Sequence, residues 1–164
     1  MEPTAETKNR VIAIGSDHAG PDIKSRLADH LKESGFSVID LGTFSADSCD
    51  YPVYAEKVCH AVSSGMAEAG ILICGTGIGM SICANKHRGI VAAHCTDVFS
   101  AKMAREHNGA NVICMGARIS DYTSIENMTD VFLSSDPLDE EKHKRRRGMI
   151  ADLDELIDPL GIGQ

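Results

Sequence analysis

The chain has 164 residues, which is long enough for one sizeable hydrophobic core and too short for two ordinary domains. Its net charge of −8 argues against a nucleic acid or an acidic membrane as the main partner, and no apolar run approaches the length of a membrane span. A polar N-terminus and six cysteines without a C-x-x-C pair favour a reduced, cytoplasmic protein over a secreted or zinc-binding one.

Short β-branched runs alternate with helical patterns along most of the chain. In order, they predict a strand at 10–15, a helix at 21–34, a strand at 36–41, a helix at 53–63, a strand at 70–74, a helix at 79–85, a strand at 89–94, a helix at 98–107, a strand at 111–115, and helices at 125–133 and 138–156. Proline at the first or second position favours the start of the first two helices.

Strands separated by helices predict crossover units and therefore a parallel sheet. We expect an α/β fold: a Rossmann-like, doubly wound sheet of five parallel strands with helices on both faces and a long C-terminal helix. Residues 10–158 are expected to form a single domain, with flexible termini at 1–9 and 159–164. The order of the strands in the sheet is left open.

The strand at 70–74 runs into a loop with glycine at every second position, Cys74-Gly75-Thr76-Gly77-Ile78-Gly79. In a parallel sheet this junction lies at the carboxyl end of a strand, where ligands bind. Unpaired N–H groups of the loop, with the helix predicted at 79–85, offer a cradle for an anion. The loop fits neither G-x-x-x-x-G-K-[ST] nor G-x-G-x-x-G, so it favours a phosphate or an oxyanion over a dinucleotide. A tight turn that needs glycine for its shape alone is the alternative.

Several side chains are candidates for chemistry around this loop. Cys74 directly precedes the glycines, whereas Cys59, Cys83 and Cys114 fit buried, inert positions better. Cys95, beside His94 at the end of the fourth strand, is a weaker rival. Asp17-His18 and Arg118 follow the first and fifth strands, and therefore belong to the same edge of the sheet as Cys74. His107 ends a helix that returns to the opposite edge, so a catalytic His107 would come from a neighbouring subunit. The basic run 142–147 is a solvated helix face, a localisation patch or a source of cations for a phosphate.

Taken together, these residues resemble type B ribose-5-phosphate isomerase and its galactose-6-phosphate isomerase relatives from about residue 11 to residue 150. The landmarks are Gly15-x-Asp17-His18-Ala19-Gly20, Asp50-Tyr51-Pro52, the strand and loop at 70–79, Ala84-Asn85-Lys86, His107-Asn108 and Gly116-x-Arg118. The resemblance implies an aldose–ketose isomerase without metal or cofactor. It would interconvert D-ribose 5-phosphate and D-ribulose 5-phosphate of the pentose phosphate pathway.

The resemblance also implies a role for each site residue. Cys74 would move a proton between C1 and C2 through an enediolate, while Thr76 and the backbone amides of Gly75, Gly77, Ile78 and Gly79 would hold that anion. His107, assisted by Asp17, would open the furanose ring. The substrate would further contact His18, Tyr51, Asn108, Arg118, Lys142 and Arg146. Such enzymes are dimers, often paired into tetramers, whose active sites are shared between chains.

Three positions depart from the family pattern. One branch of the family uses a glutamate where this chain has Met80, which leaves Cys74 as the base. Lys142 replaces an arginine of the phosphate site, and lysine lacks the planar fork of arginine. The acidic segment after Ile150 has no counterpart. An isomerase of allose or galactose 6-phosphate and a non-catalytic phosphosugar- or nucleotide-binding module are the alternative functions.

Overall fold

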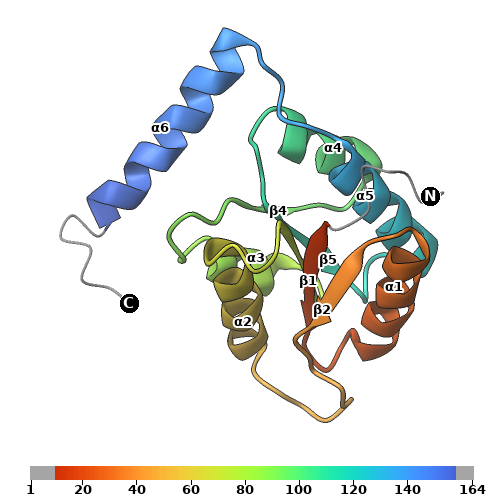
Figure 1. Ribbon diagram of the computed structural model, residues 1–164. Coiled ribbons are helices and arrows are strands. Elements are labelled where there is room, and N and C mark those ends of the chain that lie inside the picture. The colour runs from red at the N-terminus through yellow and green to blue at the C-terminus, as the bar shows by residue number, and fades with distance from the viewer. Residues whose placement is uncertain (1–9, 158–164) are drawn as a thin grey trace.

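Five parallel strands form one sheet in the computed structural model, which describes residues 10–157 (Figure 1). The strands are β1 (Val11–Ser16), β2 (Ser37–Asp40), β3 (Ala69–Cys74), β4 (Ala92–His94) and β5 (Val112–Gly116). The helices are α1 (Pro21–Glu33), α2 (Tyr51–Ser63), α3 (Ile78–Ala84), α4 (Val98–Glu106), α5 (Tyr122–Ser134) and α6 (Glu141–Ile157). The predicted fold class is therefore confirmed.

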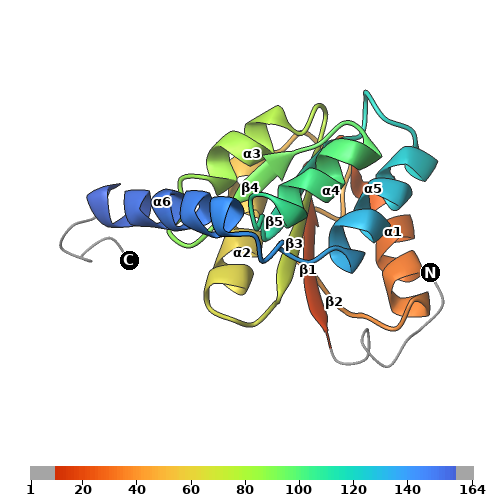
Figure 2. The ribbon, with the colours of Figure 1, turned by 90° about the horizontal axis from the view of Figure 1, so that it is seen from above.

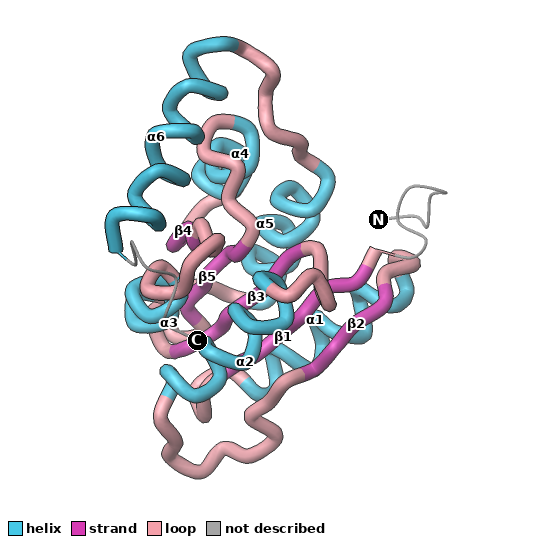
Figure 3. Tube along the Cα trace, turned by 60° about the vertical axis from the view of Figure 1, so that its left-hand side comes forward, coloured by secondary structure: helices cyan, strands magenta, loops and turns pink. Residues whose placement is uncertain are grey.

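The order of the strands is β2-β1-β3-β5-β4, and they lie side by side in Figure 3. From β1 the chain moves outward to β2 and then returns to β3 on the other side of β1. A reversal of this kind leaves a crevice at the carboxyl ends of β1 and β3, where ligands bind in open α/β sheets. In register, Cys74 at the end of β3 lies beside Gly116 at the end of β5.

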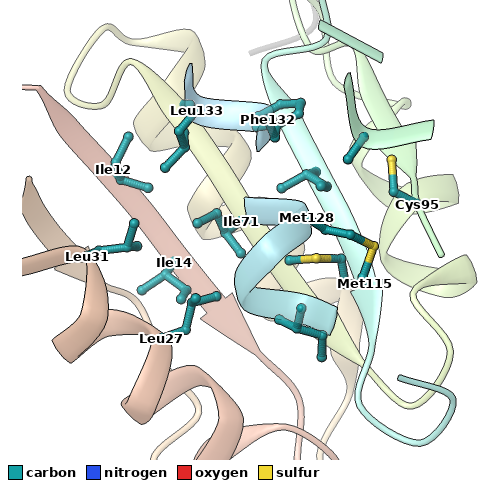
Figure 4. Close-up of a cluster of buried hydrophobic side chains, with 14 of the residues drawn as sticks. Ile12, Ile14, Leu27, Leu31, Ile71, Cys95, Met115, Met128, Phe132 and Leu133 are labelled. Carbon is teal, nitrogen blue, oxygen red and sulfur yellow. The ribbon is translucent and has the colours of Figure 1, made fainter. Parts of the chain in front are cut away.

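Alternating side chains of the strands divide the core into two layers. Ile12, Ile14, Ile71 and Met115 face α1, α4 and α5, as the close-up in Figure 4 shows for α1 and α5. The intervening residues face α2 and α3 on the opposite side of the sheet. Each fully buried aliphatic side chain contributes about 1.5–3 kcal/mol of transfer free energy, so these two layers hold the sheet edge in place.

The fourth strand is shorter than the sequence predicts, with three residues in place of six. Two asparagine side chains hold the chain around its start. Asn85 accepts from the N–H of Ala92, the first residue of β4, at 2.9 Å and donates to its carbonyl at 2.8 Å. Asn111 accepts from the N–H of Val91 at 2.9 Å and donates to the carbonyl of Gly89 at 2.8 Å. The carbonyl of Val91 also accepts the backbone N–H groups of Asn111 at 3.0 Å and Val112 at 3.3 Å, so side-chain amides supplement the neighbouring strand here.

The last helix, α6, projects outward from the layers (Figures 1 and 2). It begins at Glu141 rather than at residue 138. The rings of His107 and His143 stack near its N-terminal end, and near its other end Asp154 Oδ2 accepts the N–H of Gly89 at 2.8 Å. The predicted flexible termini lie outside the described residues.

Among residues 10–157, no helix combines the length and the apolar composition that a membrane crossing requires.

Candidate active site

The loop after β3 turns a backbone N–H group toward the thiol of Cys74. The residue is 5% exposed, and its sulfur accepts the N–H of Gly77 at 3.1 Å. This hydrogen bond holds the sulfur against the glycine loop. The sequence placed this cysteine at the carboxyl edge of the sheet, and the structure agrees.

Three further amides of the loop face no acceptor within residues 10–157. The N–H groups of Gly75, Thr76 and Gly79 donate no hydrogen bond to the described protein, whereas that of Ile78 approaches Thr76 Oγ1 at 3.4 Å. Since α3 has only seven residues, its dipole adds little, and the anion cradle rests on the loop amides themselves. The cradle can hold a phosphate oxygen or an oxyanion beside Cys74.

The glycines of the loop lie under neighbouring side chains. A Cβ on Gly75 would be 3.2 Å from the Arg118 guanidinium, and one on Gly79 would be 2.8 Å from the Tyr51 ring. Gly77 has a φ of +81° and would place a Cβ 2.7 Å from the ring of His94. Gly77 therefore serves the shape of the turn, whereas Gly75 and Gly79 allow the close approach of Arg118 and Tyr51.

The end of β1 brings Asp17 and His18 to the same edge. The N–H of Asp17 donates to the carbonyl of Ile73 at 3.1 Å, which places Asp17 next to β3 one residue before Cys74. Asp17 as a residue is 6% exposed, and its carboxylate accepts the N–H of Ala19 at 2.8 Å. His18 Nδ1 accepts the N–H of Cys49 at 3.3 Å, so its ring is fixed over the loop before α2.

Burial raises the pKa of three other core cysteines. The pKa of Cys59 rises to about 12 and that of Cys95 to about 11, and the pKa of Cys114 lies well above its usual value. These three side chains remain protonated near neutral pH and pack as small apolar groups.

The remaining predicted site residues form a second group, at the opposite edge of the sheet. His107 caps the C-terminus of α4, and Asn108 follows it, close to the chain that enters β5. Lys142 and Arg146 lie one turn apart near the start of α6. Because α4 runs back from the carboxyl edge, the chain does not bring this group to its own Cys74.

Two histidines that sequence reasoning left without a role take part in these groups. His143 is 4% exposed, and its ring stacks on that of His107 with centroids 4.1 Å apart and planes 12° apart. Burial, and then the neighbouring His107, lowers the pKa of His143 from its usual value. Nε2 of His94 lies 2.8 Å from the carbonyl oxygen of Thr76. The only signal for His143 was its place within the basic run.

Comparison with known proteins identifies the family. Residues 12–150 match the family described as Ribose/Galactose Isomerase. The chain is 43% identical over 148 residues to the galactose-6-phosphate isomerase subunit LacB of Clostridium acetobutylicum, an alignment that covers 90% of this chain and 84% of the relative. It is 44% identical over 124 residues to ribose-5-phosphate isomerase B of Escherichia coli, which covers 76% of this chain and 83% of the relative.

Solved structures show the same likeness. Ribose-5-phosphate isomerase B of Clostridium thermocellum superposes with a TM-score of 0.86 at 43% identity, over 89% of this chain and 98% of the other. The type B ribose 5-phosphate isomerase of Leishmania infantum gives a TM-score of 0.86 at 41% identity, over 90% and 98%. Because the family match spans residues 12–150 and these relatives are more than 40% identical, this chain belongs to the ribose/galactose isomerase family of enzymes.

Proposed function

We propose that this protein interconverts D-ribose 5-phosphate and D-ribulose 5-phosphate. The observation that carries the proposal is the thiol of Cys74 beside a row of open backbone N–H groups. A proton next to a carbonyl is removed most easily where a base and preorganised oxyanion donors lie together. Relatives named ribose-5-phosphate isomerase B support the pentose substrate, and the LacB relative makes galactose 6-phosphate the second candidate.

In the proposed mechanism the Cys74 thiolate removes the proton from C2 of the open-chain aldose. The electron pair moves onto the C1 carbonyl oxygen and gives an enediolate, whose negative charge the N–H groups of Gly75, Thr76 and Gly79 stabilise. The same proton returns from the thiol to C1 while the hydroxyl proton of O2 passes to O1, which gives the C1 hydroxyl and the C2 ketone of the ketose. Removing one such oxyanion donor typically costs about 10²–10³ in kcat.

The first group of side chains would bind the sugar phosphate around this loop. Arg118, which lies above Gly75, would supply a positive charge for the phosphate, and His18 at the end of β1 would supply a hydrogen-bond donor. The ring of Tyr51 lies above Gly79 and would line the site. The buried Asp17 carboxylate, held by the N–H of Ala19, suits a sugar hydroxyl and the proton transfers of ring opening.

The second group would reach Cys74 from a partner subunit, in a homodimer or a tetramer of this chain. His107 would open the furanose ring there, and Asn108 would contact sugar hydroxyls. A groove of about 480 Å³ supports this arrangement, because it runs along the edge strand β4 and includes both His94 and Asn108. Its rim carries Phe99, which is 73% exposed, so a second copy would bury apolar surface.

Among the cations of α6, Arg145 and Arg146 are the best candidates for the phosphate. Lys142 is paired with Glu140 at 2.7 Å, and Lys144 with Asp139 at 2.7 Å. Arg147 donates to the carbonyl of Leu138 at 3.0 Å. The exposed Arg145 and Arg146 have no acidic partner within residues 10–157, and either can offer the planar fork that Lys142 lacks.

Direct assay tests the reaction. We expect turnover of ribose 5-phosphate in the presence of EDTA, measured beside allose 6-phosphate and galactose 6-phosphate at equal concentration. Cys74→Ser should lower kcat by about a hundredfold or more while ribose 5-phosphate still binds. Turnover of a hexose alone would change the substrate but not the mechanism. If folded and reduced protein turns over none of the three sugars, the proposal is contradicted.

Mixing two inactive variants tests the shared site. In a random mixture of Cys74→Ser and His107→Asn chains half of the dimers are mixed, and each mixed dimer holds one intact site. We therefore expect about a quarter of the wild-type activity to return once native mass spectrometry shows that subunits have exchanged. If exchange is complete and no activity returns, both residues serve the same chain.

A further inference from the structure

His94 occupies a position from which it can act on the proposed base without touching the substrate. It is the last residue of β4, and its ring lies against the loop that follows β3. Its Nε2 is 2.8 Å from the carbonyl oxygen of Thr76. Since a carbonyl oxygen only accepts hydrogen bonds, Nε2 carries a proton and donates it in this contact.

The peptide group that accepts this hydrogen bond also serves Cys74. The carbonyl of Thr76 and the N–H of Gly77 belong to one amide, and that N–H donates to Cys74 Sγ at 3.1 Å. Hydrogen bonds in series polarise one another, so donation to the carbonyl makes the N–H of the same amide a stronger donor. The imidazole and the thiol are therefore connected through a single peptide group.

Steric contacts keep these two hydrogen bonds and the peptide group between them in place. A Cβ on Gly77 would lie 2.7 Å from Cδ2 of His94 and 2.9 Å from the backbone carbon of Met115. The amide is thus confined between the imidazole on one side and the central strand β5 on the other. Charged side chains on the surrounding elements include Asp17 after β1, Arg118 after β5 and Asp97, which caps α4 through the N–H of Ser100.

We propose that His94 is a positioning residue that stabilises the thiolate of Cys74 through the Thr76–Gly77 peptide group. The role of the thiolate rests on the proposed isomerase function, whereas the connection itself does not. A neutral imidazole polarises the amide, and an imidazolium polarises it more strongly because its N–H is a charged donor. The effect reaches the thiol without any atom of His94 entering the substrate site.

Titration of the thiolate tests the connection without substrate. Its ultraviolet absorbance is measured against pH as the difference between each protein and the same protein carrying Cys74→Ser, which removes the signal of the other cysteines. His94→Leu should move the midpoint upward by about half a pH unit, a threefold lower thiolate fraction below the midpoint. His94→Gln keeps an N–H donor at the position of Nε2 and should lie much closer to wild type.

Kinetics and controls complete the test. In His94→Leu we expect kcat for ribose 5-phosphate to fall about threefold in the same pH range, with KM nearly unchanged. His60→Leu removes an exposed histidine on α2 and should leave both the midpoint and the kinetics unchanged. If His94→Leu and His94→Gln shift the midpoint equally, or neither shifts it while both remain folded, the proposal is wrong. A shifted midpoint in a protein inactive on every sugar would uphold the connection and reject only the isomerase function.

Discussion

Replacing Gly77 by alanine measures how tightly the loop beside Cys74 is held. The φ of Gly77 is +81°, a left-handed conformation that costs an L-residue about 1–2 kcal/mol. The added Cβ would also lie 2.7 Å from His94 and 2.9 Å from the backbone carbon of Met115, and a central strand cannot move aside. Overpacking of this kind costs about 1–3 kcal/mol, so we expect Gly77→Ala to lose about 2–5 kcal/mol in total.

Two other glycines separate the backbone cost from the contact. Gly65 and Gly89 have φ values of +79° and +74°, and a Cβ on either would meet no atom within 4 Å. Gly65→Ala should therefore lose only the backbone share, about 1–2 kcal/mol. Urea unfolding at a single protein concentration gives both free energies, and the fixed concentration keeps the mass-action contribution of any subunit association equal in the two proteins.

The difference between the two variants is the decisive quantity. An excess loss of at least about 1 kcal/mol in Gly77→Ala over Gly65→Ala would show that His94 and β5 confine the loop. We also expect kcat to fall in Gly77→Ala alone, because a displaced amide no longer donates to Cys74. Equal losses in the two proteins, with activity retained, would refute the account of a confined loop.

Other parts of the molecule give further predictions. Lys24 is 2% exposed and donates to the Asp40 carboxylate of β2 at 2.6 Å. Lys24→Met should therefore lower the free energy of unfolding in urea by roughly 1–3 kcal/mol. Lys32→Met, at an exposed position, should lower it by about 0.5 kcal/mol or less. Burial lowers the pKa of His143, so as the pH falls the unfolded chain takes up a proton at this residue before the folded chain does. Thermal stability should therefore fall as the pH drops below about 6.5. His143→Phe keeps a ring stacked on His107 and should weaken that fall. Asp154→Ala should speed hydrogen exchange in the second half of α6 with little change in Tm, and Asp152→Ala, on the same helix, should not.

Elements with a strong local pattern were predictable from the sequence. Each buried strand is a β-branched run, and proline or glycine marks many of the ends, so most boundaries differ from the structure by one to three residues. The fourth strand was predicted too long because apolar residues 90 and 91 continue its pattern. The N–H of Ile90 instead donates to the carbonyl of His87 and that of Val91 to the side chain of Asn111, and such contacts leave no periodic trace in the sequence.

The candidate site was predictable in the parts that are continuous in the chain. Cys74 and its glycines are adjacent residues, and the placement of Asp17 and Arg118 follows from the parallel direction of the strands. The contact of His94 with Thr76 spans 18 positions, and it arises because β4 is separated from β3 by β5 alone. No sequence pattern gives the strand order, so no pattern could have joined these two residues.

The segment beyond the family match has a mechanical consequence for the basic residues of α6. A helix of 17 residues is a rod of about 25 Å, and a rod that is held at one end can pivot about that end. Here the stacked histidines hold the N-terminal end, while Asp154 holds the other through the N–H of Gly89, with Arg88 3.6 Å from Glu155. Residues 12–150 match the family, so Asp154 and Glu155 of the second attachment lie beyond the matched residues. Two attachments fix the direction of the rod, and with it the direction in which Arg146 would face a partner subunit in the proposed dimer.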